Sequence, residues 1–181
     1  MAKISNTTVY PNIIPTANDY LVLTDVNDNN ETKTAKVTDF QKFFGTLTKE
    51  VTITSTQILS SYSNPVELIP APGAGYYIIP FGTIVVKNNF KTNPYSFTLL
   101  GGFITQTDGV STAAWTIIQK AFLEKGFTEV QSFAAVDNNT LAAPTLTGMD
   151  NRPLLFQADT ANPTGGDGTL TFNIQYRIVQ I

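Results

Sequence analysis

The chain has 181 residues, of which 42% are hydrophobic and 14% charged, and its 11 basic and 14 acidic side chains leave a net charge of −3. This length and apolar content predict one full domain with an extension and exclude a disordered chain. The absence of histidine and cysteine excludes imidazole bases, thiolates and disulfides, and the scattered basic residues exclude the charged stripe that nucleic-acid binding needs. No apolar run approaches the ~20 residues of a membrane-spanning helix.

The first 18 residues are partly apolar but show no period. Val9, Tyr10, Ile13 and Ile14 stand among Asn, Thr and two prolines. An aperiodic apolar terminus of this kind is expected to lie across its own domain or across a partner. It lacks the apolar core of a secretory signal peptide, so we expect synthesis in a cytoplasm.

A β-hairpin and a short helix are predicted next. Two β-rich stretches, 19–24 and 32–37, flank the turn-forming run 25–30. Over 38–45, a capping-box start and a terminal glycine predict the helix. Three phenylalanines share one helical face and must be buried: Phe40, Phe43 and Phe44.

Residues 1–45 and 46–181 are predicted to form two parts, an N-terminal arm and a larger body. The first 45 residues carry 9 of the 25 charges, whereas the remainder is more neutral and richer in turn residues. The boundary is placed in the stretch 46–50, before the first predicted strand of the body.

The body is predicted to consist of short strands separated by Gly, Pro and Asn turns. A single helical turn over 56–60 is expected to be capped by Ser55, and Gly101-Gly102 is expected to end the strand before it. This strand spacing predicts a mainly β domain, a β-sandwich or jelly roll, with the sandwich favoured. The predicted strands cover residues 51–53, 65–69, 76–81, 84–86, 95–100, 103–106, 127–136, 153–158 and 168–181.

Residues 111–125 are ambiguous between helix and strand. Apolar residues recur at helical spacing and Gly126 follows them, so the period predicts a helix. The alternative is a strand over 115–118, because short apolar runs fit both periods. The helical face consists of Ala114, Ile117, Ile118, Ala121 and Phe122.

No arrangement of residues predicts catalysis or metal binding. A glycosidase needs two carboxylates that face each other, and the acids after residue 100 have no such spacing and are interpreted as solvated loop acids. The oxygen-rich runs 25–31 and 159–167 are interpreted as turns; the first has Asn30 and Lys36 where a calcium loop needs glycine and glutamate. Trp115 could stack on a sugar, but its apolar neighbours favour a core position. The sequence therefore predicts no enzyme, cofactor or metal.

Two stretches resemble small jelly-roll virion structural proteins of tailed bacteriophages. PVELIPAPGAGYYIIP (65–80) resembles their proline- and glycine-marked motif, and NPTGGDGTLTFNIQYRIVQI (162–181) resembles their closing strand. Upstream, residues 14–44 are similar to an N-terminal module of phage fibre and decoration proteins, those of crAss-like phages included. The resemblance implies a tumour-necrosis-factor-like jelly roll that forms a homotrimer, and an N-terminal arm that docks on the virion.

Site residues follow from this resemblance. The arm is expected to anchor through apolar side chains, and the absence of a heptad repeat predicts a short projection. The C-terminal strand has two readings, the core of one chain or the shared core of an oligomer. The predicted anchoring residues are Val9, Tyr10, Ile13, Ile14 and Tyr20. The candidate trimer-interface residues are Tyr76, Tyr77, Phe172, Ile174 and Tyr176.

The favoured hypothesis is a non-enzymatic phage structural protein located in the virion, a trimeric head fibre or capsid decoration. Its partners would be two further copies of itself and a capsid or other virion protein, with no nucleic acid and no membrane. The alternative is a tail-associated receptor-binding module that recognises host surface carbohydrate. A glycan-degrading enzyme ranks last, because no residue pair supports it.

Overall fold

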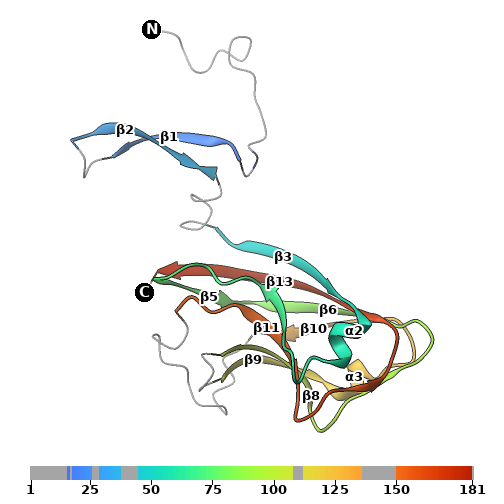
Figure 1. The fold of residues 1–181 in the computed structure, drawn as a ribbon. Coiled ribbons are helices and arrows are strands. Elements are labelled where there is room, and N and C mark those ends of the chain that lie inside the picture. Colours follow the sequence, from blue (N-terminus) through green and yellow to red (C-terminus); the bar gives the residue numbers. More distant parts are fainter. Residues whose placement is uncertain are drawn as a thin grey trace, which may run out of the picture. The chain divides into compact units, whose positions relative to one another are not determined.

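The computed structural model describes residues 16, 18–25, 29–37, 45–107, 112–135 and 150–180, and the chain divides into two compact units, 1–45 and 46–181. In the first unit, β1 (Tyr20–Asp25) pairs antiparallel with β2 (Glu31–Lys36) (Figure 1). Asn29 and Asn30 take φ values of 51° and 59° beside the turn, a region that asparagine tolerates. The predicted hairpin is confirmed, whereas the helix predicted over 38–45 lies almost wholly outside the described residues.

The second unit is mainly β, with short helices between some of its strands. Among the described residues, no helix is long and apolar enough to cross a membrane. The strands are β3 (Leu47–Ile53), β4 (Val66–Ile69), β5 (Tyr76–Pro80), β6 (Thr83–Asn89), β7 (Tyr95–Ser96), β8 (Gly101–Thr107), β9 (Thr112–Gln119), β10 (Glu129–Ala134), β11 (Leu154–Ala158), β12 (Thr164–Gly165) and β13 (Thr169–Gln180). The helices are α2 (Ser55–Leu59) and α3 (Lys120–Leu123).

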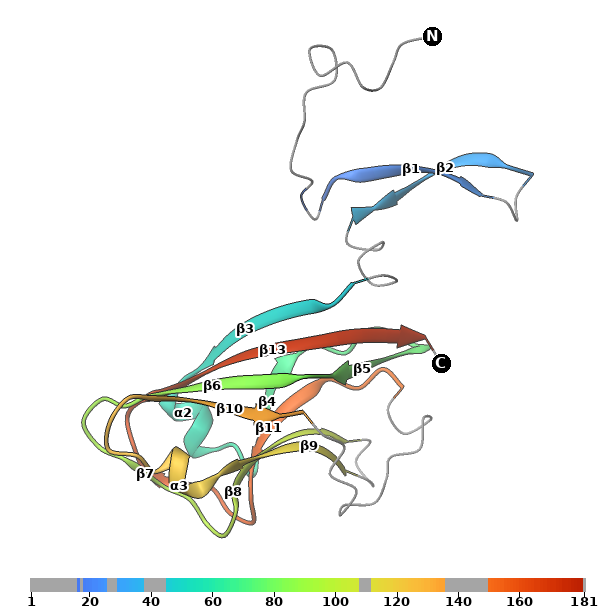
Figure 2. The same ribbon diagram turned by 180° about the vertical axis from the view of Figure 1, so that it is seen from behind.

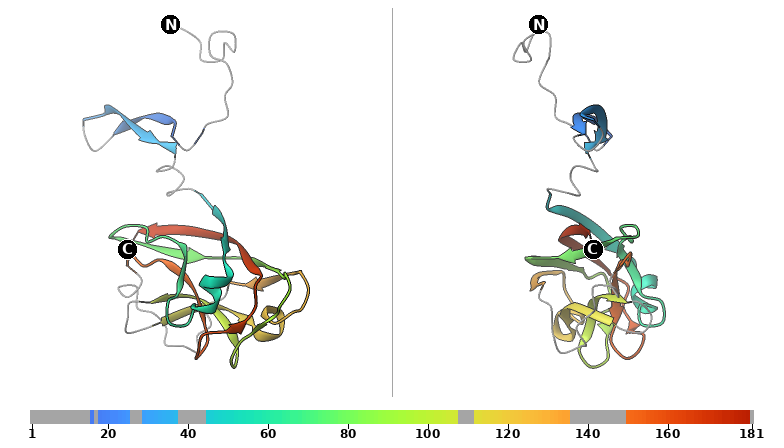
Figure 3. Two further views of the ribbon diagram at one scale, coloured as in Figure 1. Left: turned by 45° about the vertical axis from the view of Figure 1, so that its right-hand side comes forward. Right: turned by 90° about the vertical axis from the view of Figure 1, so that its left-hand side faces the viewer.

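Two antiparallel sheets build this unit. One has the order β10-β6-β13-β3 and the other the order β4-β11-β8-β9, while β7 and β12 form a separate two-residue pair (Figures 1 and 2). The β13 strand (red) and the β8 and β9 strands (yellow) lie in different layers in both views of Figure 3. The apolar faces of the two sheets meet between these layers, an arrangement consistent with a β-sandwich.

β13 is the central strand of its sheet. It pairs with β3 on one side and with β6 and then β5 on the other. Between the pairs Pro80–Tyr176 and Val85–Asn173, the β5–β6 side has four residues where β13 has two, so Phe81 and Gly82 lie at a bulge. β5 and β6 therefore act as one long strand that bends at Gly82, whose φ is 68°.

Alternation along β13 places one face in the core. Leu170, Phe172 and Ile174 are fully buried, and the ring of Phe172 meets that of Phe156 from the other sheet with centroids 5.4 Å apart. Burial of such side chains is the main favourable term in folding. The other large side chains that are fully buried are Ile53, Ile58, Ile78, Ile84, Ile104, Ile118, Leu123 and Leu154.

The helix predicted over 111–125 is wrong for most of its length. Residues 112–119 form β9, which pairs with β8 from Gly101–Gln119 to Thr107–Thr112, and only 120–123 are helical. Ala114, Thr116 and Ile118 are buried, which is the two-residue period of a strand. Pairing with β8 overrides the helical spacing of the apolar residues.

Three smaller predictions are also corrected. Only Tyr95 and Ser96 of the stretch 95–100 form a strand, and Gly101 begins β8 instead of ending its predecessor. Thr54 and not Ser55 caps α2, since its hydroxyl accepts the Gln57 N–H while the Gln57 side chain accepts the Thr54 N–H. The first strand of the body begins at residue 47, inside the stretch predicted as a boundary.

Candidate functional site

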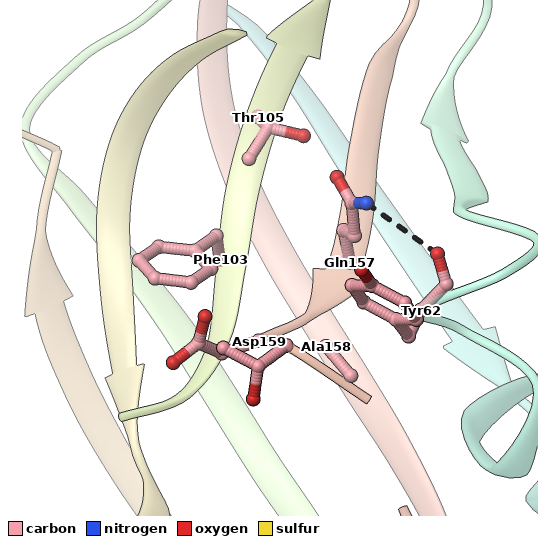
Figure 4. A pocket seen from close by; sticks show the side chains of 7 residues that line it. Tyr62, Phe103, Thr105, Gln157, Ala158 and Asp159 are labelled. Atoms are coloured by element: carbon pink, nitrogen blue, oxygen red, sulfur yellow. Dashed lines mark hydrogen bonds between the residues drawn. The ribbon is translucent and has the colours of Figure 1, made fainter. Parts of the chain in front are cut away.

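A pocket of about 210 Å³ opens on the sheet that contains β8 and β11 (Figure 4). Two aromatic rings, Tyr62 and Phe103, line it together with the polar side chains of Gln157 and Asp159. The rest of its wall comes from Thr105, Ala158 and Thr160. The wall therefore combines apolar rings with a few polar groups, the usual composition of small-molecule sites.

The register between β8 and β11 puts Phe103 beside Gln157. These two residues are direct partners on neighbouring antiparallel strands, so their side chains leave the same face of the sheet. Their neighbours Ile104 and Phe156 point the other way and are fully buried in the core. Strand alternation thus supplies one ring and one amide to the pocket from a rigid sheet.

Tyr62 is held by its backbone. The N–H groups of Tyr62 and Ser63 donate to the Asn162 side-chain oxygen at 3.0 and 3.1 Å, and Gln157 Nε2 donates to the Tyr62 carbonyl at 3.4 Å. The Tyr62 side chain remains 43% exposed. The segment after α2 therefore fixes the position of this ring without burying it.

Asp159 is fixed at the end of β11. Its N–H donates to the Gly101 carbonyl, and its Oδ2 accepts the Leu100 N–H at 3.2 Å. The Thr98 hydroxyl donates to the Asp159 carbonyl and in turn accepts the Thr160 hydroxyl at 2.8 Å. Among the described residues, no hydrogen bond reaches Asp159 Oδ1, so this oxygen can accept one from a ligand.

Thr105 is the unusual member of the wall. Thr105 is 2% exposed, and its hydroxyl oxygen is buried without a hydrogen-bond partner among the described residues. Buried hydroxyls are normally paired, because leaving one unpaired costs free energy. Figure 4 shows Thr105 on the wall shared with Phe103 and Gln157, but its hydroxyl oxygen is closed off from solvent and therefore from a molecule in the pocket.

The described lining residues of the pocket include a single acidic side chain. This side chain is Asp159, whereas hydrolysis of a glycoside uses two carboxylates. Within the part of the chain that the structure describes, no three acidic residues gather as a metal-binding group. The arrangement can hold a ligand with a flat apolar face and several hydroxyl groups.

The predicted anchoring and interface residues are not part of this pocket. Val9, Tyr10, Ile13 and Ile14 lie outside the described residues, while Tyr20 on β1 is 60% exposed and stacks under Lys36 Nζ at 5.9 Å. No spacing signal in the sequence connects the residues that line the pocket, because they come from three distant segments.

The interface candidates divide between core and surface. Phe172 and Ile174 are fully buried within one chain, so their prediction as trimer contacts is wrong and the core reading of β13 holds for them. Tyr76, Tyr77 and Tyr176 are half-buried, and burial raises the pKa of Tyr176. Strand alternation puts Tyr76 and Tyr77 on opposite faces of the sheet.

Trp115 lies at the border of the core. It is partly buried against the core cluster, and its indole N–H donates to Gln106 Oε1 at 2.9 Å. Gln106 Nε2 in turn donates to the Arg152 carbonyl at 3.3 Å. Trp115 therefore packs against the edge of the core, and its indole N–H has a hydrogen-bond partner, as partly buried tryptophans usually do.

Searches of protein-family models, of curated proteins and of solved structures found nothing that matches this chain.

Proposed function

We propose that the protein is a non-enzymatic structural protein of a tailed-phage virion, a trimeric head fibre or capsid decoration with a jelly-roll body. Residues 1–45 would attach it to a capsid or other virion protein, and residues 46–181 would project from the particle. The resemblance of residues 14–44, 65–80 and 162–181 to phage proteins first suggested this function. The observation that supports it best is the strand order of the body.

The order of the eight main strands supports a jelly-roll body. A jelly roll with strands lettered B to I has the sheets B-I-D-G and C-H-E-F, and reading β3, β4, β5–β6, β8, β9, β10, β11 and β13 as B to I gives these two sheets. The correspondence requires β5 and β6 to count as one bent strand, which the bulge at Gly82 supports. Viral capsid proteins are among the proteins that use this architecture, although a fold alone does not determine a function.

The hairpin of the first unit supports an attachment role. Tyr20, Val22 and Leu23 on β1 are 60, 70 and 41% exposed. An isolated two-stranded hairpin is marginally stable in water. Exposed apolar side chains on both of its faces are typical of a surface that another protein contacts. A virion protein that covers this hairpin would stabilise it, and three copies in one trimer would multiply a weak contact.

A surface for the trimer is available at the end of β13. Tyr77 and Ile79 on β5 pair with Val179 and Arg177, so all four side chains leave the outer face of the sheet. They are half-buried or exposed, and Arg177 stacks on the Phe81 ring at 4.8 Å. This patch replaces Phe172 and Ile174 as the proposed contact between copies.

Light scattering on the purified full chain tests the trimer. A mass of three chains at micromolar concentration is expected, and Tyr77→Arg should dissociate the trimer because it places a charge in an apolar contact. The matched control is Phe127→Arg, since Phe127 is an aromatic residue that is already 54% exposed. A monomer at this concentration, or equal effects of both substitutions, contradicts the proposal.

Binding to particles tests the attachment. Capsids that lack the protein should bind the full chain and the double variant Tyr20→Ser, Val22→Ser should bind more weakly, while Phe127→Ser should bind like the full chain. A chain without residues 1–45 that still binds would contradict attachment through the arm.

A second candidate function is a tail-associated receptor-binding module that recognises host surface carbohydrate. The pocket between Tyr62 and Phe103 favours it, because aromatic rings beside amide and carboxylate groups suit a sugar. Immunogold labelling of particles distinguishes the two functions. Label on the head supports the first candidate, and label on the tail supports the second.

A further inference from the structure

We propose that the pocket lined by Tyr62 and Phe103 binds one neutral pyranose ring of a glycan. The inference deepens the second candidate function and rests on it for its biological setting. The binding itself is a property of the purified chain and does not depend on where a virion carries the protein. The size, the apolar wall, the polar groups and the charge of the pocket each support it.

The size of the pocket limits the ligand to a single ring. Its volume of about 210 Å³ is below the ~300–1,000 Å³ of sites that enclose drug-sized ligands. The pocket is also open to solvent at Tyr62, whose side chain is 43% exposed. A sugar ring could therefore enter while the rest of a glycan stays outside.

The apolar wall matches one face of a pyranose. Sugar rings carry C–H bonds that gather on one side, and this side packs on the negative face of an aromatic ring. Figure 4 shows Phe103 on one side of the hollow and Tyr62 on the other. No hydrogen bond of the Tyr62 hydroxyl is recorded among the described residues, so this ring is placed for contact with a ligand and not for a role in the core.

The polar wall calls for a ligand that donates hydrogen bonds. Asp159 uses Oδ2 to accept the Leu100 N–H, and Gln157 uses Nε2 to reach the Tyr62 carbonyl. Asp159 Oδ1 and Gln157 Oε1 have no hydrogen bond among the described residues. Two acceptors on neighbouring side chains suit the adjacent hydroxyl groups of a sugar, which can donate a hydrogen bond to each.

The charge of the pocket selects against acidic sugars. Asp159 is the one charged side chain among the described lining residues, and it is negative. A uronate would bring a second negative charge into the same small site, where like charges repel. The ligand class is therefore a neutral pyranose.

Tyr62 and the first residue of β3 lie at different ends of that strand's course through the body. β3 runs from Leu47, where the arm joins the body, to Ile53, and α2 and Tyr62 follow this far end. A seven-residue strand spans roughly 20 Å. Tyr62 is thus separated by the length of β3 from the residue that leads to the arm.

Saturation-transfer NMR on the purified full chain tests the site. The probes are the methyl glycosides of glucose, galactose and mannose, N-acetylglucosamine and, as the acidic member, glucuronic acid. Each is used at about 10 mM, where a site with a millimolar dissociation constant is mostly occupied. We expect transfer to the ring protons of at least one neutral sugar and at least tenfold weaker binding of glucuronic acid.

Variants link the binding to the pocket. Tyr62→Ala should weaken binding about tenfold through the lost ring contact, whereas Tyr62→Phe should retain it. Asp159→Asn should weaken it by a similar factor or more, because a charged acceptor is lost. Phe127→Ala removes an exposed aromatic ring outside the pocket and should leave binding unchanged. The exposure of Tyr62 makes Tyr62→Ala safe for folding, which circular dichroism would verify.

Three results would overturn the inference. The first is no transfer to any neutral sugar, the second is equal binding of glucuronic acid, and the third is equal binding by folded Tyr62→Ala and Phe127→Ala. None of these results affects the mass measured by light scattering or the position of the immunogold label on the particle. Failure of the sugar site is therefore distinguishable from failure of either candidate function.

Discussion

The ring of Phe156 on β11 packs against the ring of Phe172 on β13, and this contact joins the two sheets of the body. The centroids are 5.4 Å apart with the ring planes inclined at 47°, and both side chains are fully buried. We expect Phe172→Ala to lower the free energy of unfolding by about 3–5 kcal/mol, because it leaves a cavity between the sheets. Urea unfolding followed by Trp115 fluorescence measures this, since Trp115 is the single tryptophan and lies in the body.

Phe127→Ala is the matched control for this prediction. The same atoms are removed from a side chain that is 54% exposed, so the change should stay within about 0.5 kcal/mol. A loss of similar size in both variants would contradict the assignment of Phe172 to the core between the sheets.

Gly102 is expected to tolerate no side chain. A Cβ atom at this position would lie 2.6 Å from Cε2 of Phe156, closer than real Cβ atoms approach a carbon. Gly102→Ala should therefore displace the Phe156 ring and lower the free energy of unfolding by about 1–3 kcal/mol. Gly126→Ala is the control, because a Cβ there meets nothing within 4 Å. Equal midpoints of urea unfolding for the two variants would rule out the predicted clash.

The hydroxyl of Tyr95 is expected to matter more than that of Tyr62. Tyr95 donates to the Gly168 carbonyl at 2.7 Å in a buried position. Tyr95→Phe should lower the free energy of unfolding by about 1–2 kcal/mol, because the carbonyl loses its partner. Tyr62→Phe should have little effect, and a comparable loss in both variants would contradict the prediction.

The same hydroxyl gives a test at alkaline pH. Burial, with a smaller contribution from Asp167, raises the pKa of Tyr95 from 10.0 to about 12. Because the folded pKa is the higher one, the stabilisation is fully present below pH 10 and is lost as the pH rises through about 12. The stability difference between wild type and Tyr95→Phe should therefore narrow over this range. A constant difference would indicate that Tyr95 does not titrate as expected.

Protonation of the Asp167 carboxylate is expected to make the body less stable in acid. Asp167 Oδ1 accepts the N–H groups of Thr92 and Asn93 at 2.9 Å, and these bonds lower the pKa of its carboxyl. Because the folded pKa is the lower one, the stabilisation is present above the usual value of 3.8 and is lost as the pH falls through the folded pKa. Thermal unfolding of Asp167→Asn should accordingly depend less on pH between about pH 5 and pH 2 than wild type does.

Asp19→Asn provides the control for the acid prediction. Hydrogen bonds from Thr16 lower the pKa of the Asp19 carboxyl too, but Asp19 belongs to the first unit. Unfolding of the body, followed by Trp115, should keep its wild-type dependence on pH in this variant. An equal change in both variants would argue against a local role of Asp167.

Strict alternation made β13 predictable. Leu170, Phe172 and Ile174 occupy every second position, and the structure buries all three. The hairpin of the first unit was predictable for a different reason, since its Asp- and Asn-rich turn admits left-handed conformations that other residues avoid. In both cases the conformation that the local sequence favours is also the one that the folded protein adopts.

Residues 111–125 show where local pattern fails. Ala114, Ile118 and Phe122 are buried and spaced four residues apart, which puts them on one face of a helix or on one face of a strand. The pattern alone could not separate these cases. Residues 112–119 form a strand because they pair with β8, and this pairing depends on residues 101–107, which lie outside the pattern.

The pocket could not be predicted from spacing at all. Its two rings are 41 positions apart, at Tyr62 and Phe103, and its carboxylate is Asp159. The register between β8 and β11 and the hydrogen bonds of Asn162 bring these segments together. Only the tertiary structure contains that information.

The central position of β13 has a consequence for synthesis. Its partners β3, β5 and β6 leave the ribosome long before residues 169–180 do, and until then the sheet lacks its middle strand. Until then, the backbone groups of these strands that pair with β13 have no partner. Unpaired strand edges of this kind favour slow folding and aggregation. Nascent chains of this protein should need protection by chaperones until residue 180 has been translated.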